Sequence, residues 1–417
     1  MRAMNYDQHP SQLPSLIGFH STLSRRLLAL LASGVVLAGC GGDTSSLAPN
    51  LQCPKGLQAV WINAAAGTAE CVAPLPLTDG SQPKTGLQQA FPAMLRPEGS
   101  ISSPARIELG RLLYFDPVLS GDNKVACASC HHPAYGFGDG RAVSTGIGGQ
   151  KGGRSAPTVW NAAFAREQFW DGRVKTLEDQ AKGPISNPIE MNQNPQQLLV
   201  ELKAIPEYVR RFDEAFGGSG GSAVTIDNLA AAIATFERTV VSANSPYDRY
   251  AAGEASALSE SARRGLNLFR SVSTRCFECH GTPLFANPDY KVLGIPSLAN
   301  KAMLDSDLGR AAVIAGKANE RAFRVPTLRN IAKTAPYMHN GVFNTLEEVL
   351  DFYAGGGGLG HGFTVDNIDD KIRKFTLTKD EKADLIAFLN ALTDESLLPE
   401  VPSQLPSGLP APQGPLP

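Results

Sequence analysis

Apolar residues recur at helical spacing late in each half of the chain. Residues 225–240 and 377–393 each place their large apolar side chains on one face, as an amphipathic helix does. These positions are Ile226, Leu229, Ile233 and Phe236 in the first segment and Leu385, Phe388, Leu389 and Leu392 in the second. Thr378 and Glu381 form the Thr-x-x-Glu pattern of a capping box, which predicts a helix start at the second segment.

Two further helices are predicted at residues 102–117 and 258–273. Ser103 suits a helix N-cap, and Pro104 suits the first helical position. The later segment is again helical and again carries a glycine and an aromatic residue. Convincing runs of alternating polar and apolar residues are lacking, so the pattern predicts a mainly α fold with an internal duplication and many loops.

A C-x-x-C-H motif follows each of these two earlier helices. The motif residues are Cys127, Cys130 and His131 in the first half and Cys276, Cys279 and His280 in the second. This is the attachment motif of haem c, in which two thiols bond the haem vinyl groups and the adjacent histidine ligates iron. The motifs predict two covalently bound haem c groups and two cytochrome c-type haem domains in tandem.

Zinc and dithiol chemistry are the alternatives for these cysteines. Structural zinc pairs usually lie about 15–20 residues apart, a spacing much shorter than that between Cys127 and Cys276. A redox dithiol would leave His131 and His280 without a role. The neighbouring His132 is interpreted as a loop residue.

The N-terminus has the features of a bacterial export signal. Arg25 and Arg26 precede the apolar run Leu27–Gly39, which is too short to span a bilayer. The run leads into the sequence LAGC, which resembles a lipobox and predicts lipidation of Cys40. We therefore expect a periplasmic protein anchored to a bacterial membrane, and the outer membrane is favoured. An ordinary signal peptide cut elsewhere is the alternative.

Composition adds two expectations. The formal net charge is −2 and no basic block stands out, so nucleic acid is not expected as a partner. Cys53 and Cys71 remain outside the haem motifs, and in an exported protein they predict a disulfide, with two free thiols as the alternative. The predicted organisation is a signal peptide (1–39), a tether (40–85), haem domains at 86–255 and 256–396, and a Pro-rich tail (397–417) that is extended or disordered.

The segments around the second haem motif carry a family resemblance. Residues 156–191 strongly resemble the bacterial di-haem cytochrome c peroxidases and their relative MauG, and residues 323–353 resemble the second domain of the same superfamily. The likeness runs from about residue 100 to 395. It implies a di-haem peroxidase-type oxidoreductase that uses hydrogen peroxide.

Three residues match functional positions of that superfamily. Trp170 matches the tryptophan between the two haems, whose indole can relay an oxidising equivalent, although a buried core aromatic is the alternative. Gln180 matches a glutamine in the distal pocket of the first haem. Glu190 matches the distal carboxylate that moves the peroxide proton, although a surface glutamate in a loop is the alternative.

Two positions favour the MauG-like branch. The loop after the first motif (140–157) contains no histidine, whereas most conventional peroxidases block the first iron with one. The second haem has Tyr353 where those peroxidases supply a methionine, and MauG also has tyrosine there. A phenolate favours high-valent iron, whereas methionine favours Fe(II). Met338 and His361 are the rival ligands.

The resemblance also implies a calcium ion between the domains. The ligands would be the Thr334 and Pro336 carbonyls with Ser155, which stands where the family has asparagine and would bind more weakly.

The expected activity is reaction with peroxide at an open first haem and sharing of the oxidising equivalents through Trp170, in a bis-Fe(IV)-like state. The reductant is a protein substrate oxidised at a distance in the MauG-like interpretation. It is a small cytochrome c or cupredoxin in the conventional peroxidase interpretation. A non-catalytic di-haem electron carrier is the hypothesis from another class.

Overall fold

The computed structural model describes residues 51–54, 57–63, 68–72, 89, 91–94, 96–98 and 100–416. The predicted signal peptide, the lipobox and Cys40 lie outside these residues. Within the part of the chain that is described, no helix has the length and apolar character needed to cross a membrane.

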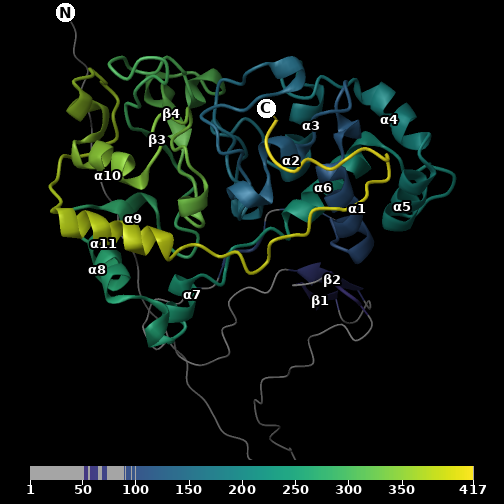
Figure 1. Cartoon of the computed structure of the whole chain (residues 1–417), viewed down its shortest axis with the longest axis horizontal. Helices are drawn as coiled ribbons and strands as arrows, with labels where there is room; N and C mark the ends of the chain where they lie inside the picture. The colour runs from purple at the N-terminus through teal and green to yellow at the C-terminus, as the bar shows by residue number, and fades with distance from the viewer. Residues whose placement is uncertain are drawn as a thin grey trace, which may run out of the picture. The chain divides into compact units, whose positions relative to one another are not determined.

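The fold is mainly α, as predicted (Figure 1). The helices are α1 (Pro104–Phe115), α2 (Cys127–Cys130), α3 (Leu177–Ser186), α4 (Pro195–Lys203), α5 (Pro206–Phe216), α6 (Ile226–Glu237), α7 (Pro246–Ala251), α8 (Glu260–Phe269), α9 (Cys276–Cys279), α10 (Leu346–Ala354) and α11 (Lys379–Asn390). Two antiparallel pairs of strands complete the described elements: β1 (Gln58–Asn63) with β2 (Thr68–Val72), and β3 (Tyr290–Val292) with β4 (Ala322–Arg324).

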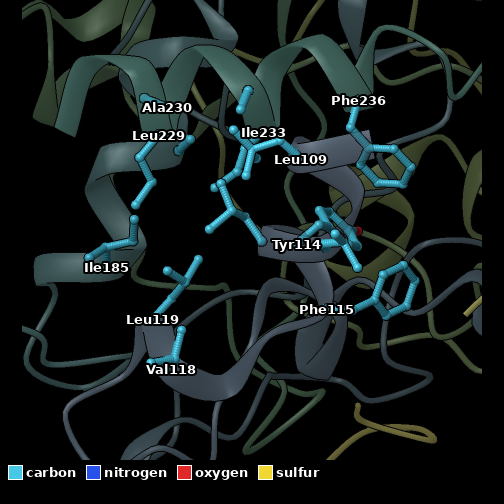
Figure 2. Packing of buried hydrophobic residues seen from close by; sticks show 14 of the residues in the cluster. Leu109, Tyr114, Phe115, Val118, Leu119, Ile185, Leu229, Ala230, Ile233 and Phe236 are labelled. Carbon is cyan, nitrogen blue, oxygen red and sulfur yellow. The ribbon is translucent and has the colours of Figure 1, made fainter. Parts of the chain in front are cut away.

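The first core lies between α1, α3 and α6 (Figure 2). Helix α1 begins as predicted, with the Ser103 side chain accepting a hydrogen bond from the Arg106 amide and Pro104 in the first turn. The apolar face of α6 packs Leu229, Ile233 and Phe236 into this core. Burial of that face out of water supplies the driving force for the packing.

The second core repeats this arrangement with α8 and α11, which pack against each other. Thr378 and Glu381 form the predicted capping box at the start of α11. A Cβ atom built on Gly110 of α1 would lie 1.9 Å from the Ala232 carbonyl oxygen, and one built on Gly265 of α8 would lie 1.9 Å from that of Asp384. Glycine therefore permits the same close helix contact in both halves, which supports the predicted duplication.

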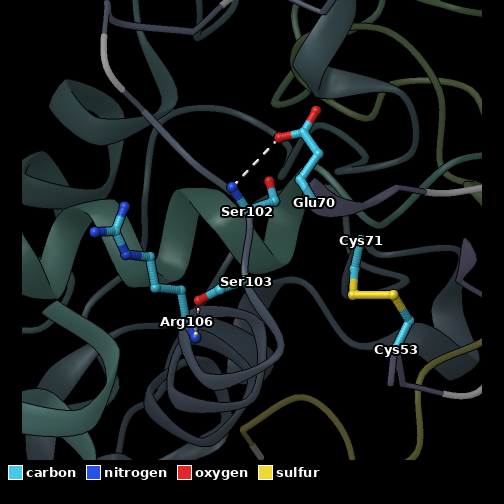
Figure 3. The surroundings of a disulfide bond; sticks show 6 residues. All are labelled: Cys53, Glu70, Cys71, Ser102, Ser103 and Arg106. Carbon is cyan, nitrogen blue, oxygen red and sulfur yellow. Dashed lines mark hydrogen bonds between the residues drawn. A yellow bond between two sulfur atoms is a disulfide. The ribbon is translucent and has the colours of Figure 1, made fainter. Parts of the chain in front are cut away.

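The β1–β2 hairpin is joined to the residues before α1 (Figure 3). Cys53 and Cys71 form the predicted disulfide, with their Cα atoms 5.5 Å apart. The Glu70 carboxylate accepts a hydrogen bond from the Ser102 amide (3.4 Å) and pairs with Arg96. These contacts hold the hairpin against the start of the first core.

The Pro-rich tail is extended, which is one of the two predicted alternatives, and it packs against the first half of the chain. Figure 1 draws it in yellow, running from α11 to the helices of the first half. Leu405 is buried within the first core, and the Ser407 hydroxyl donates a hydrogen bond to Asp116 (2.7 Å). The end of the chain thus completes the packing of its first half.

Candidate functional site: two haem-attachment motifs and the cavity between the halves

Each C-x-x-C-H motif forms a single helical turn that ends at its histidine. These turns are α2 and α9, and the amides of His131 and His280 donate hydrogen bonds to Cys127 and Cys276 (2.9 Å each). The one-turn geometry places both thiols and the imidazole on one side of a short segment, as haem c attachment requires. None of the four motif cysteines is engaged in a disulfide, so all four remain for haem attachment.

Both histidines are oriented by a backbone carbonyl. Nδ1 of His131 lies 3.2 Å from the Phe137 oxygen, and Nδ1 of His280 lies 3.0 Å from the Phe285 oxygen. A hydrogen bond from Nδ1–H leaves the Nε2 lone pair free for iron and fixes the ring orientation. Burial lowers the pKa of His131, and it lowers the pKa of His280 to about 4. Both imidazoles are therefore neutral, as ligands must be.

A cavity of about 480 Å³ adjoins the second motif. Its walls include Cys276, Cys279 and His280 from the motif, Tyr353 from α10, and Trp170 from the first half of the chain. The lining is largely apolar, and it includes two histidines, three tyrosines and one methionine: His280, His339, Tyr290, Tyr337, Tyr353 and Met338. These residues fit a haem c.

The three rival ligands of the second haem differ in where they lie. Tyr353 and Met338 both line the cavity, whereas His361 is exposed and stacks near Phe352 and Phe363. Burial raises the pKa of Tyr353. Tyr353 lines the cavity together with both attachment cysteines, Cys276 and Cys279.

Trp170 is held at the cavity by both halves of the chain. Its indole Nε1–H donates a hydrogen bond to the Ser155 carbonyl (2.8 Å), and its own carbonyl accepts one from the Arg324 amide (2.9 Å). The Ser155 amide in turn donates to the His339 carbonyl (2.7 Å). These bonds restrict the indole to one position on the cavity wall.

Glu190 contacts the glycine-rich loop that follows the first motif. Its backbone carbonyl accepts a hydrogen bond from Ile147 in the glycine-rich loop (2.8 Å), and its carboxylate accepts one from the Asn187 side chain (2.8 Å). A Cβ atom on Gly146 would lie 2.1 Å from the Ile189 carbonyl oxygen, so a side chain there would push the loop away. Among its effects, Glu190 raises the pKa of Cys130, which burial raises more strongly.

The Glu190 carboxyl is itself perturbed. Burial raises its pKa, while Arg173 and the hydrogen bond from Asn187 oppose that shift. A carboxyl group with a raised pKa is suited to accept and return a proton near neutral pH. Gln180 lies in α3, half-buried, on the same segment of chain, but neither it nor Glu190 lines the cavity of the second motif.

The residues implied as calcium donors lie on one cavity wall. Ser155, Thr334 and Pro336 all line the cavity, where Ser155 would offer its hydroxyl. Among the described residues, no cluster of three or more His, Cys, Asp or Glu side chains could hold a metal ion. Calcium prefers six to eight oxygen ligands that include carboxylates, so this donor set fits it poorly.

A charged network between the halves escaped the sequence analysis. Arg154 pairs with Asp171 (2.7 Å) and with Asp307 (2.6 Å), and Arg310 pairs with Glu167 (3.0 Å). The Tyr290 hydroxyl donates a hydrogen bond to Glu167 (2.5 Å). The partners are up to 153 residues apart, so no local pattern could have paired them.

Glu237 is a second residue that the sequence analysis missed. It is buried at the end of α6, and its Oε2 has no hydrogen-bond partner among the described residues. Burial raises its pKa to about 8, and its charge raises the pKa values of Tyr114 and Cys127. Its position four residues after Ile233, on the apolar face of the helix, was the available signal.

Several known proteins are similar to this chain in sequence. The family model described as di-haem cytochrome c peroxidase matches residues 104–256. Cytochrome-c peroxidase IdrP1 of Pseudomonas sp. (strain SCT) is 36% identical over 354 residues, which cover 78% of this chain and 90% of that protein. Methylamine utilization protein MauG of Methylorubrum extorquens is 36% identical, with 73% and 84% covered.

A solved structure is similar as well. It is described as a MauG-like protein associated with microbial copper homeostasis, and it is 34% identical, with a TM-score of 0.68. The match covers 75% of this chain and 96% of that one. Two haem c groups are the cofactors of such proteins, and the two motifs fit them. The chain is therefore a peroxidase-type oxidoreductase and belongs to the di-haem cytochrome c peroxidase family.

Proposed function

We propose that this enzyme is MauG-like: it reacts with hydrogen peroxide at an open first haem and shares the oxidising equivalents with a second haem ligated by His280 and Tyr353. The observation that carries the proposal is the cavity that brings Tyr353 and Trp170 to the second C-x-x-C-H motif. When bound, the two haems supply the redox chemistry, namely reaction with peroxide and storage of two oxidising equivalents.

The residues of the chain supply proton transfer, orientation and electron relay. Glu190 takes the proton from the near oxygen of peroxide and returns it to the leaving oxygen, with Gln180 helping to orient the substrate. The raised pKa of Glu190 supports this role. Trp170 relays electrons between the two sites, and its hydrogen bond to Ser155 keeps the indole in place.

Two kinds of reductant are compatible with this chemistry. The MauG-like interpretation has a protein substrate oxidised at a distance, and Tyr353 with the histidine-free loop favours it. The second candidate is a conventional cytochrome c peroxidase that reduces hydrogen peroxide with electrons from a small cytochrome c or cupredoxin. The relatives support this candidate too, because they include proteins named as peroxidases and as MauG at the same identity.

The proposal includes a location and a domain division. The Cys53–Cys71 disulfide supports an exported, periplasmic protein, because disulfides persist in oxidising compartments. Lipidation of Cys40 would tether it to a membrane, with the outer membrane favoured. The two haem domains are assigned to residues 86–255 and 256–396. No step is assigned to calcium, since the donor set around Ser155 fits it poorly.

Addition of stoichiometric peroxide to the diferric protein without oxygen tests the proposal. Optical, near-infrared and electron paramagnetic resonance (EPR) spectra should lose the ferric signals promptly and gain a near-infrared band from charge shared between the haems. Reaction only after one haem has been reduced would support the conventional peroxidase instead. If the protein does not react with peroxide in either state, the hypothesis of a non-catalytic electron carrier would be supported.

A further inference from the structure

Two segments that lie outside the helices of the haem region, one before α1 and one after α11, each contact the loop that follows one haem-ligating histidine. We call residues 400–416 the C-terminal strap and residues 89–94 the N-terminal strap, of which residue 90 is outside the described set. The loop that positions His131 ends at Phe137, and the loop that positions His280 ends at Phe285, because those carbonyls face the imidazole Nδ1 atoms.

The C-terminal strap contacts the first half at several points. The Glu400 carbonyl accepts a hydrogen bond from Arg111 of α1 (2.8 Å), and Leu405, only 6% exposed, is part of the first core. The Ser407 hydroxyl donates to Asp116, the buried residue that caps the end of α1 and also accepts a hydrogen bond from Tyr208 (2.6 Å). The strap is thus anchored to the helix that precedes the first motif.

From these anchors the strap reaches the His131 loop. Gly414 lies against the Tyr135 ring, from which an added Cβ would be 3.6 Å away. The loop under the strap is closed by hydrogen bonds from the His132 amide to Gly138 (2.9 Å) and from the Phe137 amide to His132 (3.0 Å).

A second route leads from the same anchors to the ligand. The Tyr114 hydroxyl, two residues before Asp116 in α1, donates a hydrogen bond to the His131 carbonyl (2.6 Å). Movement of the end of α1 would therefore move His131 itself. The strap holds both the end of this helix and the loop after the ligand.

The N-terminal strap makes the corresponding contacts in the second half. The Thr282 hydroxyl donates to the Gln89 side chain (2.9 Å). Leu284 of the loop and Phe91 of the strap pack against the same buried cluster, which is formed by Phe164, Val241 and Ala243. The Arg329 guanidinium lies 4.9 Å from the centre of the Phe91 ring. Arg329 also donates a hydrogen bond to the Pro283 carbonyl (2.8 Å), so the strap, the arginine and the His280 loop form one packed unit.

We propose that these segments are crossed straps: the C-terminal strap positions the iron ligand His131 of the first half, and the N-terminal strap positions His280 of the second. Each strap acts by holding the carbonyl that faces the Nδ1 atom of the histidine. A firm bond from Nδ1–H makes the imidazole a stronger donor to iron and lowers the haem potential. The inference rests on the two haem sites alone and on no particular reductant.

Potentiometric titration of full-length variants tests this inference. Leu405→Ala should raise the midpoint potential of the first haem and leave the second unchanged, while Phe91→Ala should do the reverse. Hydrogen exchange should become about tenfold faster in residues 132–138 for Leu405→Ala and in residues 282–285 for Phe91→Ala. Leu398→Ala, at a tail residue that is 41% exposed, is the matched control and should change neither haem.

Ser407→Ala gives a milder version, because it removes the hydroxyl that bonds Asp116 and accepts from the Leu409 amide but leaves Leu405 in the core. It decides the question if Leu405→Ala does not fold. Equal shifts of both haems, or faster loop exchange with unchanged potentials, would overturn the inference and leave the straps as packing elements. Peroxide reactivity is measured separately. If the wild-type protein does not react with peroxide, the proposed function is refuted, but the inference that the straps position the two histidines is unaffected.

Discussion

Tyr353 lies in surroundings that favour a neutral phenol. Burial raises its pKa, so the phenolate form requires a compensating positive charge. Ferric iron in the adjoining cavity would supply that charge. Met338 lines the same cavity and needs no ionisation to act as a ligand, which is why the two side chains must be separated by experiment.

Tyr353→Phe should therefore remove the sixth ligand of the second haem. We expect its low-spin EPR signal to be replaced by a high-spin one, while Met338→Leu leaves the spectrum unchanged. The opposite pattern would make Met338 the ligand and would favour the conventional peroxidase.

Glu190 gives a prediction for pH dependence. If its carboxylate accepts the peroxide proton, the rate falls as the pH drops through its raised pKa. The Asn187 hydrogen bond stabilises the charged form, so Asn187→Ala should raise the pKa of Glu190 further and move this acidic limb to higher pH.

Glu190→Gln should slow the reaction by about 10²–10⁴-fold and abolish the limb. Stopped-flow mixing with peroxide from pH 4 to 9 measures both. A limb that stays in Glu190→Gln would assign the proton transfer to another group.

The residues that sequence could locate are those fixed by local spacing. Both haem motifs and the Cys53–Cys71 pair follow from residue type and separation. The Arg154 pairs could not be found in that way, because they depend on how distant segments pack. For the same reason the sequence could name Tyr353, Met338 and His361 as ligands but could not remove His361, which turned out to be exposed.

At the scale of elements, caps and apolar stripes predicted the four helices α1, α6, α8 and α11, whereas α3, α4, α5, α7 and α10 were not predicted. The capping box at Thr378 and the N-cap at Ser103 occur where the sequence placed them. The tail was harder, because proline excludes regular structure but does not say whether the chain packs. Burial of Leu405 depends on a site formed by the first half of the molecule.

Helix α6 carries the clearest prediction at this scale. Buried Glu237 has a pKa of about 8, well above that of an unfolded glutamate, and Glu178 and Arg238 are its charged neighbours. A raised folded-state pKa contributes stability that is fully present below about pH 4.5 and is lost as the pH rises towards 8. Glu237→Gln should therefore match the wild type near pH 4 and melt at a higher temperature above pH 8.

Thermal melts of both proteins from pH 4 to 9 measure this difference. Glu201→Gln, at a half-buried position on α4, is the control for loss of a carboxylate and should show no such trend. A constant offset between Glu237→Gln and the wild type at every pH would mean that Glu237 does not titrate on unfolding.

At the scale of the whole molecule, the proposed function requires electron transfer between the two halves. Trp170→Phe should leave the reaction of the first haem with peroxide intact but slow oxidation of the second haem by roughly tenfold or more. Rapid-mixing spectroscopy of the near-infrared band measures it. Trp160→Phe is the control, because Trp160 lines the same cavity but packs in the first core against Phe137. Equal effects of both substitutions would remove the special role of Trp170.

The contacts of the tail also bear on how the protein is made. A chain is synthesised from its N-terminus, so the first half emerges long before Leu405 and Ser407, which complete its core and hold the end of α1. The first half can therefore complete its core only after the whole chain has been synthesised. A stop codon after residue 396 would spare both haem motifs and the second core, yet it would remove residues that pack in the first core.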